Sequence, residues 1–137
     1  LMKYFIDTNI IIDLLNKDKN AQKKIKDIIS KNDIKLFINR LVRMESLRTF
    51  PLKNTKIFKD AEDTLESFEQ LEIKPSIYEK SINFSRYCKS KGINLKGKCE
   101  AIDYLHFMTA KHYGLKIVTN DKDFEKLKKA YSSWESF

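Results

Sequence analysis

Several features are scarce or missing in this sequence, and each absence narrows the class of protein. Its two cysteines, Cys88 and Cys99, are not spaced for a zinc site or for a CxxC redox pair. Because no disulfide framework is present, we expect a reducing compartment, the cytoplasm. Asp7 interrupts the apolar run near the start, so we expect no signal peptide. No apolar stretch approaches the length that crosses a membrane, so we expect a soluble protein.

Positive charge is what the sequence has in excess. Apolar side chains make up 42% of the 137 residues, which is enough for a single core and excludes general disorder. The formal net charge of +8 favours an anionic partner, either nucleic acid, an acidic protein or a membrane surface. Most of this charge is scattered lysine, so an ordinary solvated surface is the competing explanation. We favour nucleic acid and expect no membrane partner.

The spacing of apolar residues predicts strands that alternate with helices. No internal repeat, low-complexity segment or linker interrupts the pattern. It predicts one α/β domain over residues 1–137, with a central, mostly parallel sheet flanked by helices on both faces. The predicted strands are 3–6, 35–39, 71–73 and 115–119, with the tail 131–137 as a candidate edge strand. The predicted helices are 10–15, 21–30, 40–50, 55–68, 75–91, 99–113 and a short helix that ends at 129.

Four acidic residues fall near the ends of these predicted elements. Asp7 directly follows the first strand, at the edge of a parallel sheet where ligands bind. Each acid also has an ordinary structural role open to it. These are a helix cap for Asp7, an ion pair with Arg48 for Glu45, the helix dipole for Asp103 and a turn for Asp121. The coincidence of all four is what points to a shared site.

The order and spacing of several short segments resemble the PIN domain family, and most closely the VapC-type toxin ribonucleases of bacterial toxin–antitoxin pairs. The matching segments are 5–9 (FIDTN), 41–45 (LVRME), Asp103 with 109–110 (TA), and 114–124 (GLKIVTNDKDF). No single segment is specific, but together they cover nearly the whole chain. The resemblance implies a single PIN-like domain.

The resemblance also implies which residues form the site. Asp7, Glu45, Asp103 and Asp121 would form an acidic pocket, supported by hydrogen bonds from Asn9 and Thr119. Asp123 and Glu100 are candidate auxiliary acids; Glu100 precedes Asp103 by three residues, which places both on one face of a helix.

Four converging carboxylates repel one another, and a hard divalent cation removes this cost. Mg²⁺ or Mn²⁺ prefers oxygen ligands, so either ion is the expected cofactor. We expect Asp7 and Asp103 as the nearest ligands, with Glu45 and Asp121 bound directly or through water. Whether the site holds one ion or two stays open.

Basic side chains near these acids are candidates for an RNA-binding rim. Arg40, Arg43 and Arg48 surround Glu45 in the sequence, and arginine binds phosphate through two hydrogen bonds. Lys96 and Lys98 form a second candidate group before the long helix. An ordinary solvated surface explains both groups equally well.

Three hypotheses about function follow. The first is a Mg²⁺- or Mn²⁺-dependent endoribonuclease, the toxin of a pair with a cognate antitoxin and, as is usual in that family, a homodimer. The second is a PIN-like module that binds RNA or protein without catalysis. The third is a nuclease of RNA processing or DNA repair that has no antitoxin. We favour the first because all four acids are present.

Overall fold

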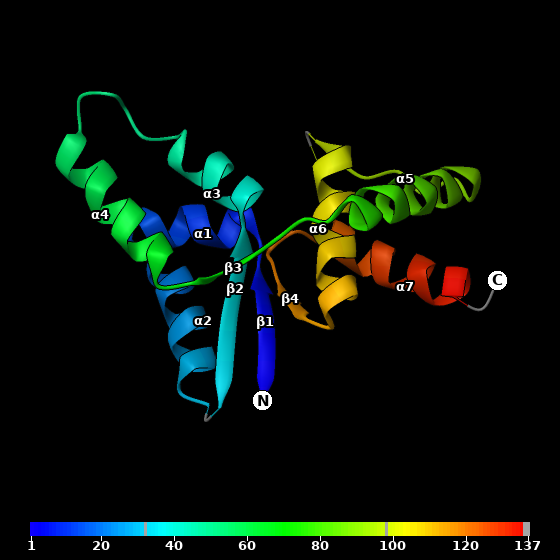
Figure 1. Ribbon diagram of the computed structural model, residues 1–137, viewed down its shortest axis with the longest axis horizontal. Coiled ribbons are helices and arrows are strands. Elements are labelled where there is room, and N and C mark those ends of the chain that lie inside the picture. The colour runs from blue at the N-terminus through cyan, green and yellow to red at the C-terminus, as the bar shows by residue number, and fades with distance from the viewer. Residues whose placement is uncertain (32, 98, 136–137) are drawn as a thin grey trace. The chain divides into compact units, whose positions relative to one another are not determined.

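The computed structural model describes residues 1–31, 33–97 and 99–135 (Figure 1). Over these ranges the chain forms an α/β fold of four strands and seven helices. Their bounds are β1 (Met2–Ile6), α1 (Thr8–Leu15), α2 (Lys19–Ile29), β2 (Ile34–Asn39), α3 (Arg40–Leu47), α4 (Thr55–Glu66), β3 (Glu69–Leu71), α5 (Pro75–Ser90), α6 (Glu100–Tyr113), β4 (Lys116–Val118) and α7 (Asp123–Glu135).

The elements divide into two units. The first comprises Leu1–Glu72 with Leu115–Asn120, and the second comprises Ile73–Gly114 with the chain from Asp121 onward. The first unit therefore contains the whole described sheet, whereas the second contains α5, α6 and α7.

The described strands form one parallel sheet in the order β3-β2-β1-β4. β1 lies between β2 and β4, and the side chains of Phe5 and Ile6 are fully buried. Because the strands are parallel, their carboxyl ends share one edge of the sheet. Asp7 and Thr119 immediately follow β1 and β4, and Asn39 ends β2 at this edge. The predicted parallel α/β architecture is confirmed.

Helices of the first unit continue directly from these strand ends. Asn39, itself fully buried, caps α3 by accepting a 2.9 Å hydrogen bond from the backbone N–H of Val42. α1 contacts both α2 and α3, and α3 contacts α4. The start of α1 and the middle of α3 therefore lie next to each other.

An aromatic cluster forms the core of the second unit. The ring of Phe84 in α5 stacks on Phe107 at 5.5 Å and lies 5.1 to 5.8 Å from the rings of Tyr104, Tyr131 and Trp134. Gly114 ends α6 in the left-handed conformation, with φ of +67°, as a C-terminal glycine stop does. Three helices thus pack around one buried side chain.

The tail, β3 and α3 differ from the predicted elements. α7 extends to Glu135, so the described part of the tail is helical and not an edge strand, because Tyr131 and Trp134 lie on the helix face that packs on Phe84. β3 lies two residues earlier than predicted, at Glu69–Leu71, where its backbone pairs with β2. α3 ends at Leu47, three residues before the predicted end.

Within the ranges that the structure describes, every helix is too short or too polar to cross a lipid bilayer.

We expect Phe84→Ala to lower the free energy of unfolding by about 3–5 kcal/mol, because it removes the ring at the centre of the aromatic cluster and leaves a cavity. Urea denaturation followed by Trp134 fluorescence measures this change. Tyr78→Ala, a change in the same helix at a side chain that is 47% exposed, is the matched control and should cost less than about 1 kcal/mol. Equal losses in the two variants would contradict the assignment of this core.

Candidate metal-binding carboxylates

Asp7 lies at the carboxyl end of β1 and caps α1. Its carboxylate accepts hydrogen bonds from the backbone N–H of Thr8 at 2.8 Å and from the hydroxyl of Thr119 at 2.7 Å. The side-chain nitrogen of Asn9 lies 3.4 Å from the same oxygen that Thr119 contacts, and 3.3 Å from the Thr119 hydroxyl. Asp7 is only 5% exposed. These uncharged donors therefore fix the direction of a nearly buried carboxylate.

Glu45 belongs to the same group of side chains through Thr8. The Thr8 hydroxyl donates a 2.7 Å hydrogen bond to Glu45 Oε1, while the Thr8 N–H donates to Asp7. Glu45 is half-buried in α3, the helix that contacts α1. One threonine thus orients two carboxylates, one at the end of β1 and one within α3, that are 38 residues apart in the chain.

A second group of carboxylates forms in the second unit. Asp103, Asp121 and Asp123 each offer one oxygen, and these three oxygens lie within 4.8 Å of one another. Asp103 is in the first turn of α6, and Asp121 precedes α7. The backbone N–H of Asp123 donates to Asp121 Oδ1 at 2.9 Å, which holds the turn before α7 in shape.

Both oxygens of Asp123 are engaged by nearby donors. The backbone N–H groups of Lys96 and Gly97 donate to Oδ2 at 2.7 and 3.3 Å, and the Lys126 ammonium lies 3.2 Å from Oδ1. Burial opposes ionisation of Asp123, which is 3% exposed, but these donors outweigh it, so the pKa of Asp123 lies below its ordinary value. Asp123 therefore anchors the loop before α6 as an anion.

Gly97 in that loop lies against the second group of acids. A Cβ atom at this position would stand 2.6 Å from Asp103 Oδ2 and 4.0 Å from Asp121 Oδ2. The first distance is far below van der Waals contact, so only glycine fits without a shift of the carboxylate. Gly97 therefore leaves room beside Asp103 and Asp121, and the hydrogen bond from its N–H to Asp123 holds it there.

These residues fit a hard divalent cation. Mg²⁺ and Mn²⁺ select carboxylate and water oxygens, and the second group brings three carboxylates together beside a space that a single methyl group would fill. Asp7 and Glu45 offer the same donor chemistry in the first unit. The donor set in both units therefore suits the cofactor that the sequence predicts.

The other predicted site residues have varied environments. Glu100 is exposed at the start of α6, and Lys96 is exposed in the loop before it. Arg40 and Arg48 are exposed at the two ends of α3, whereas Arg43 forms a 3.1 Å ion pair with Glu62 of α4. Lys98 lies outside the described residues. Arg43 thus has a packing role between helices.

Sequence reasoning missed three residues that shape these groups. These residues are Thr8, Gly97 and Lys126. The Asp-Thr-Asn order after a buried strand is a usable signal for Thr8. Gly97 and Lys126 have no such local signal, because their roles depend on Asp103 and Asp123 from other parts of the chain.

The family model of the PIN domain matches residues 4–130 of the chain. A search of curated proteins finds no significant match.

The fold is similar to those of solved toxin–antitoxin proteins. Similar structures include VapBC2 from Rickettsia felis bound to a DNA fragment from its promoter (TM-score 0.75, 19% identity, covering 92% of this chain and 93% of that one). A toxin–antitoxin complex from Klebsiella pneumoniae is also similar (0.67, 23%, 88% and 89%). So is VapC20 from Mycobacterium tuberculosis, a toxin that cleaves the sarcin–ricin loop (0.65, 14%, 90% and 93%). At these identities the likeness is one of fold.

We predict that Gly97→Ala weakens Mn²⁺ binding about tenfold or more, because the added methyl group displaces the Asp103 carboxylate. Isothermal titration calorimetry measures the affinity. Lys96→Ala is the matched control in the same loop, since it keeps the backbone N–H that Asp123 accepts. Equal Mn²⁺ affinities in the two variants would show that the space beside Gly97 is not used.

Proposed function

The chain belongs to the PIN domain family, and on this premise we propose that it is a Mg²⁺- or Mn²⁺-dependent endoribonuclease. The observation that carries the proposal is the group of Asp103, Asp121 and Asp123 beside Gly97. Asp7 and Glu45, held by one threonine, offer further oxygen ligands. We assign Asp7, Glu45, Asp103 and Asp121 as the metal ligands, as the family resemblance implies.

The chain's own residues prepare these ligands for a cation. Thr119 and Asn9 orient Asp7, and Thr8 orients both Asp7 and Glu45. When bound, a divalent cation supplies the Lewis acidity that lowers the pKa of a water molecule and offsets charge on the phosphate.

Asp123 has a positioning role in this proposal, because its oxygens already accept from the 96–97 loop and pair with Lys126. Its hold on the loop keeps Gly97 against Asp103. The net charge of +8 supports a polyanionic substrate, because positive charge around an acidic site attracts the phosphate backbone.

We further propose that the protein is a cytoplasmic toxin, a homodimer that a cognate antitoxin neutralises. The similar structures from Rickettsia felis and Klebsiella pneumoniae are toxin–antitoxin complexes, and the structure from Mycobacterium tuberculosis is a toxin that cleaves RNA. This chain covers about nine-tenths of each of those chains, which supports an equivalent size and role.

The nuclease proposal predicts that Asp7→Asn and Asp103→Asn each lower the rate of RNA cleavage at least about a hundredfold, because each removes a charged ligand oxygen. Cleavage of a labelled single-stranded RNA in Mn²⁺ is the measurement. Asp63→Asn, which removes an exposed acid that pairs only with Lys59 among the described residues, is the matched control and should retain activity.

Undiminished cleavage in EDTA would overturn the metal dependence. Mn²⁺ binding without cleavage of any RNA would instead identify a binding module.

The toxin proposal predicts that a small protein encoded beside this gene forms a stable complex with it and stops RNA cleavage. Size-exclusion chromatography with light scattering, on the two co-expressed chains, measures the complex and the dimer in one experiment. The variant Asp103→Asn should still form the complex, because it changes a ligand and leaves the fold intact. If the protein is a monomer and forms no complex with the neighbouring gene product, the toxin proposal is wrong and only the nuclease proposal remains.

A further inference from the structure

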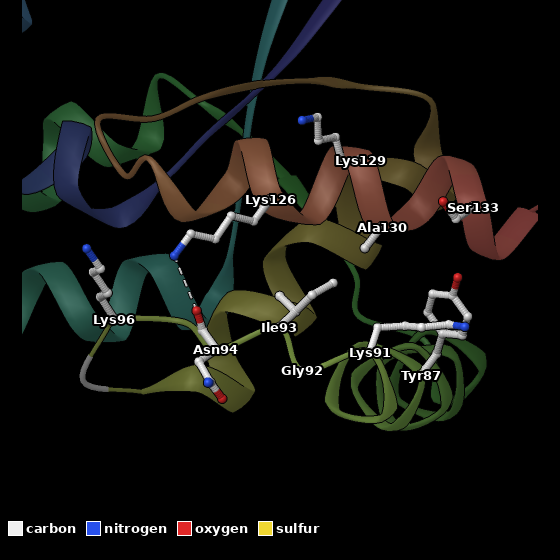
Figure 2. A pocket seen from close by; sticks show the side chains of 10 residues that line it. All are labelled: Tyr87, Lys91, Gly92, Ile93, Asn94, Lys96, Lys126, Lys129, Ala130 and Ser133. Atoms are coloured by element: carbon white, nitrogen blue, oxygen red, sulfur yellow. Dashed lines mark hydrogen bonds between the residues drawn. The ribbon is translucent and has the colours of Figure 1, made fainter.

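A pocket of about 880 Å³ lies in the second unit, beside the acidic group and separate from it (Figure 2). Its lining comes from the end of α5, the 91–96 loop and α7. Figure 2 shows Lys96 at one end of the pocket and Lys91 and Tyr87 at the other. Pockets that hold organic ligands have volumes of about 300–1,000 Å³, so this one is large enough for more than a simple anion.

The charge of the pocket is of one sign. Among the described residues that line it, four are lysines and none is acidic: Lys91, Lys96, Lys126 and Lys129. The ammonium of Lys126 is engaged by Asp123 and by the backbone carbonyl of Asn94 at 3.3 Å. The other three lysines are exposed, and none forms an ion pair with a described acid. The pocket therefore presents several positive charges to a ligand.

Apolar and aromatic groups lie between these charges. Ile93 and Ala130 supply an apolar surface, and Tyr87 supplies a half-buried aromatic ring. The Lys91 ammonium lies 5.6 Å from the centroid of the Tyr87 ring. A nucleotide combines a flat base with a charged phosphate, and this lining offers a partner for each.

The pocket lies next to the acidic group of the same unit. Lys96 lines the pocket, and its backbone N–H donates to Asp123 Oδ2 at 2.7 Å. Lys126 lines the pocket from α7 and pairs with the other oxygen of Asp123. Asp123 therefore lies directly behind the Lys96 end of the pocket.

We propose that this pocket binds a nucleotide of single-stranded RNA that flanks the cleaved phosphodiester. Lys91, Lys96 and Lys129 bind backbone phosphates, and the base packs against Tyr87 and Ile93. The inference rests on the proposed endoribonuclease function, and it names a substrate subsite for that activity. An acidic peptide matches the lysines but leaves the aromatic and apolar part of the pocket without a specific partner.

The first test is the affinity for a short fluorescent single-stranded RNA, measured by anisotropy in EDTA so that no cleavage occurs. The double variant Lys91→Glu/Lys129→Glu should weaken binding about tenfold, and the slope of log affinity against log salt should fall by about 1.4 because two phosphate contacts are lost. Lys80→Glu/Lys128→Glu is the matched control. It makes the same change in net charge at exposed lysines of α5 and α7 that lie outside the pocket.

The outcomes separate this inference from the proposed function. Wild-type cleavage of RNA together with equal binding by the two double variants overturns the pocket and leaves the nuclease standing. Weaker RNA binding in the pocket variant, with no RNA cleaved in Mn²⁺, supports the pocket and overturns the nuclease. Normal RNA binding together with loss of an acidic protein partner overturns the RNA subsite in favour of a protein-binding surface.

A second measurement starts from the wild-type protein. RNA that carries 5-iodouridine, crosslinked to the wild-type protein by ultraviolet light, should label peptides that contain Tyr87 or the 91–96 loop, as read by mass spectrometry. Tyr87→Phe keeps the ring and should keep the crosslink, whereas Tyr87→Ala should lose it. Crosslinks confined to other peptides would overturn the proposal.

Discussion

The hydrogen bonds that uncharged donors make to carboxylates are the constraint on which the rest of the candidate site depends. Thr119 and the Thr8 amide hold Asp7, and the Thr8 hydroxyl holds Glu45. An uncharged donor orients an anion without neutralising it, so the carboxylates keep the charge that a divalent cation requires. The parallel sheet makes this possible, because β1 and β4 end at the same edge.

In the second unit a carboxylate is also held by uncharged donors, but the donors are of a different kind. There the donors are backbone N–H groups of the 96–97 loop, and the acid they hold is Asp123. Asp123 fastens the loop, and the loop in turn brings Gly97 against Asp103. Asp123 thus positions the loop that lies beside Asp103 and Asp121. Lys96 of this loop also lines the lysine-rich pocket, so a single segment of chain contacts both the acidic group and the pocket.

Contacts among aromatic side chains define the helices of the second unit more than the periodicity of their apolar residues does. Ile77, Ser81, Phe84 and Cys88 are buried and lie on one face of α5. The tail was harder to predict, since Tyr131 and Trp134 have side chains common in strands. Their contact with Phe84 makes them part of a helix, and that contact is visible only once α5 and α7 lie together.

By itself, the sequence determined the alternation of strands and helices, the parallel α/β class, and the acids that follow the strand ends. These features depend on apolar spacing and on stops such as Gly114, which act over a few residues. Tertiary structure alone decided the partners of those acids. Thr119 reaches Asp7 across 112 positions, Thr8 reaches Glu45 across 37, and the Lys96 amide reaches Asp123 across 27. Such contacts depend on how distant segments close against each other, which no local pattern records.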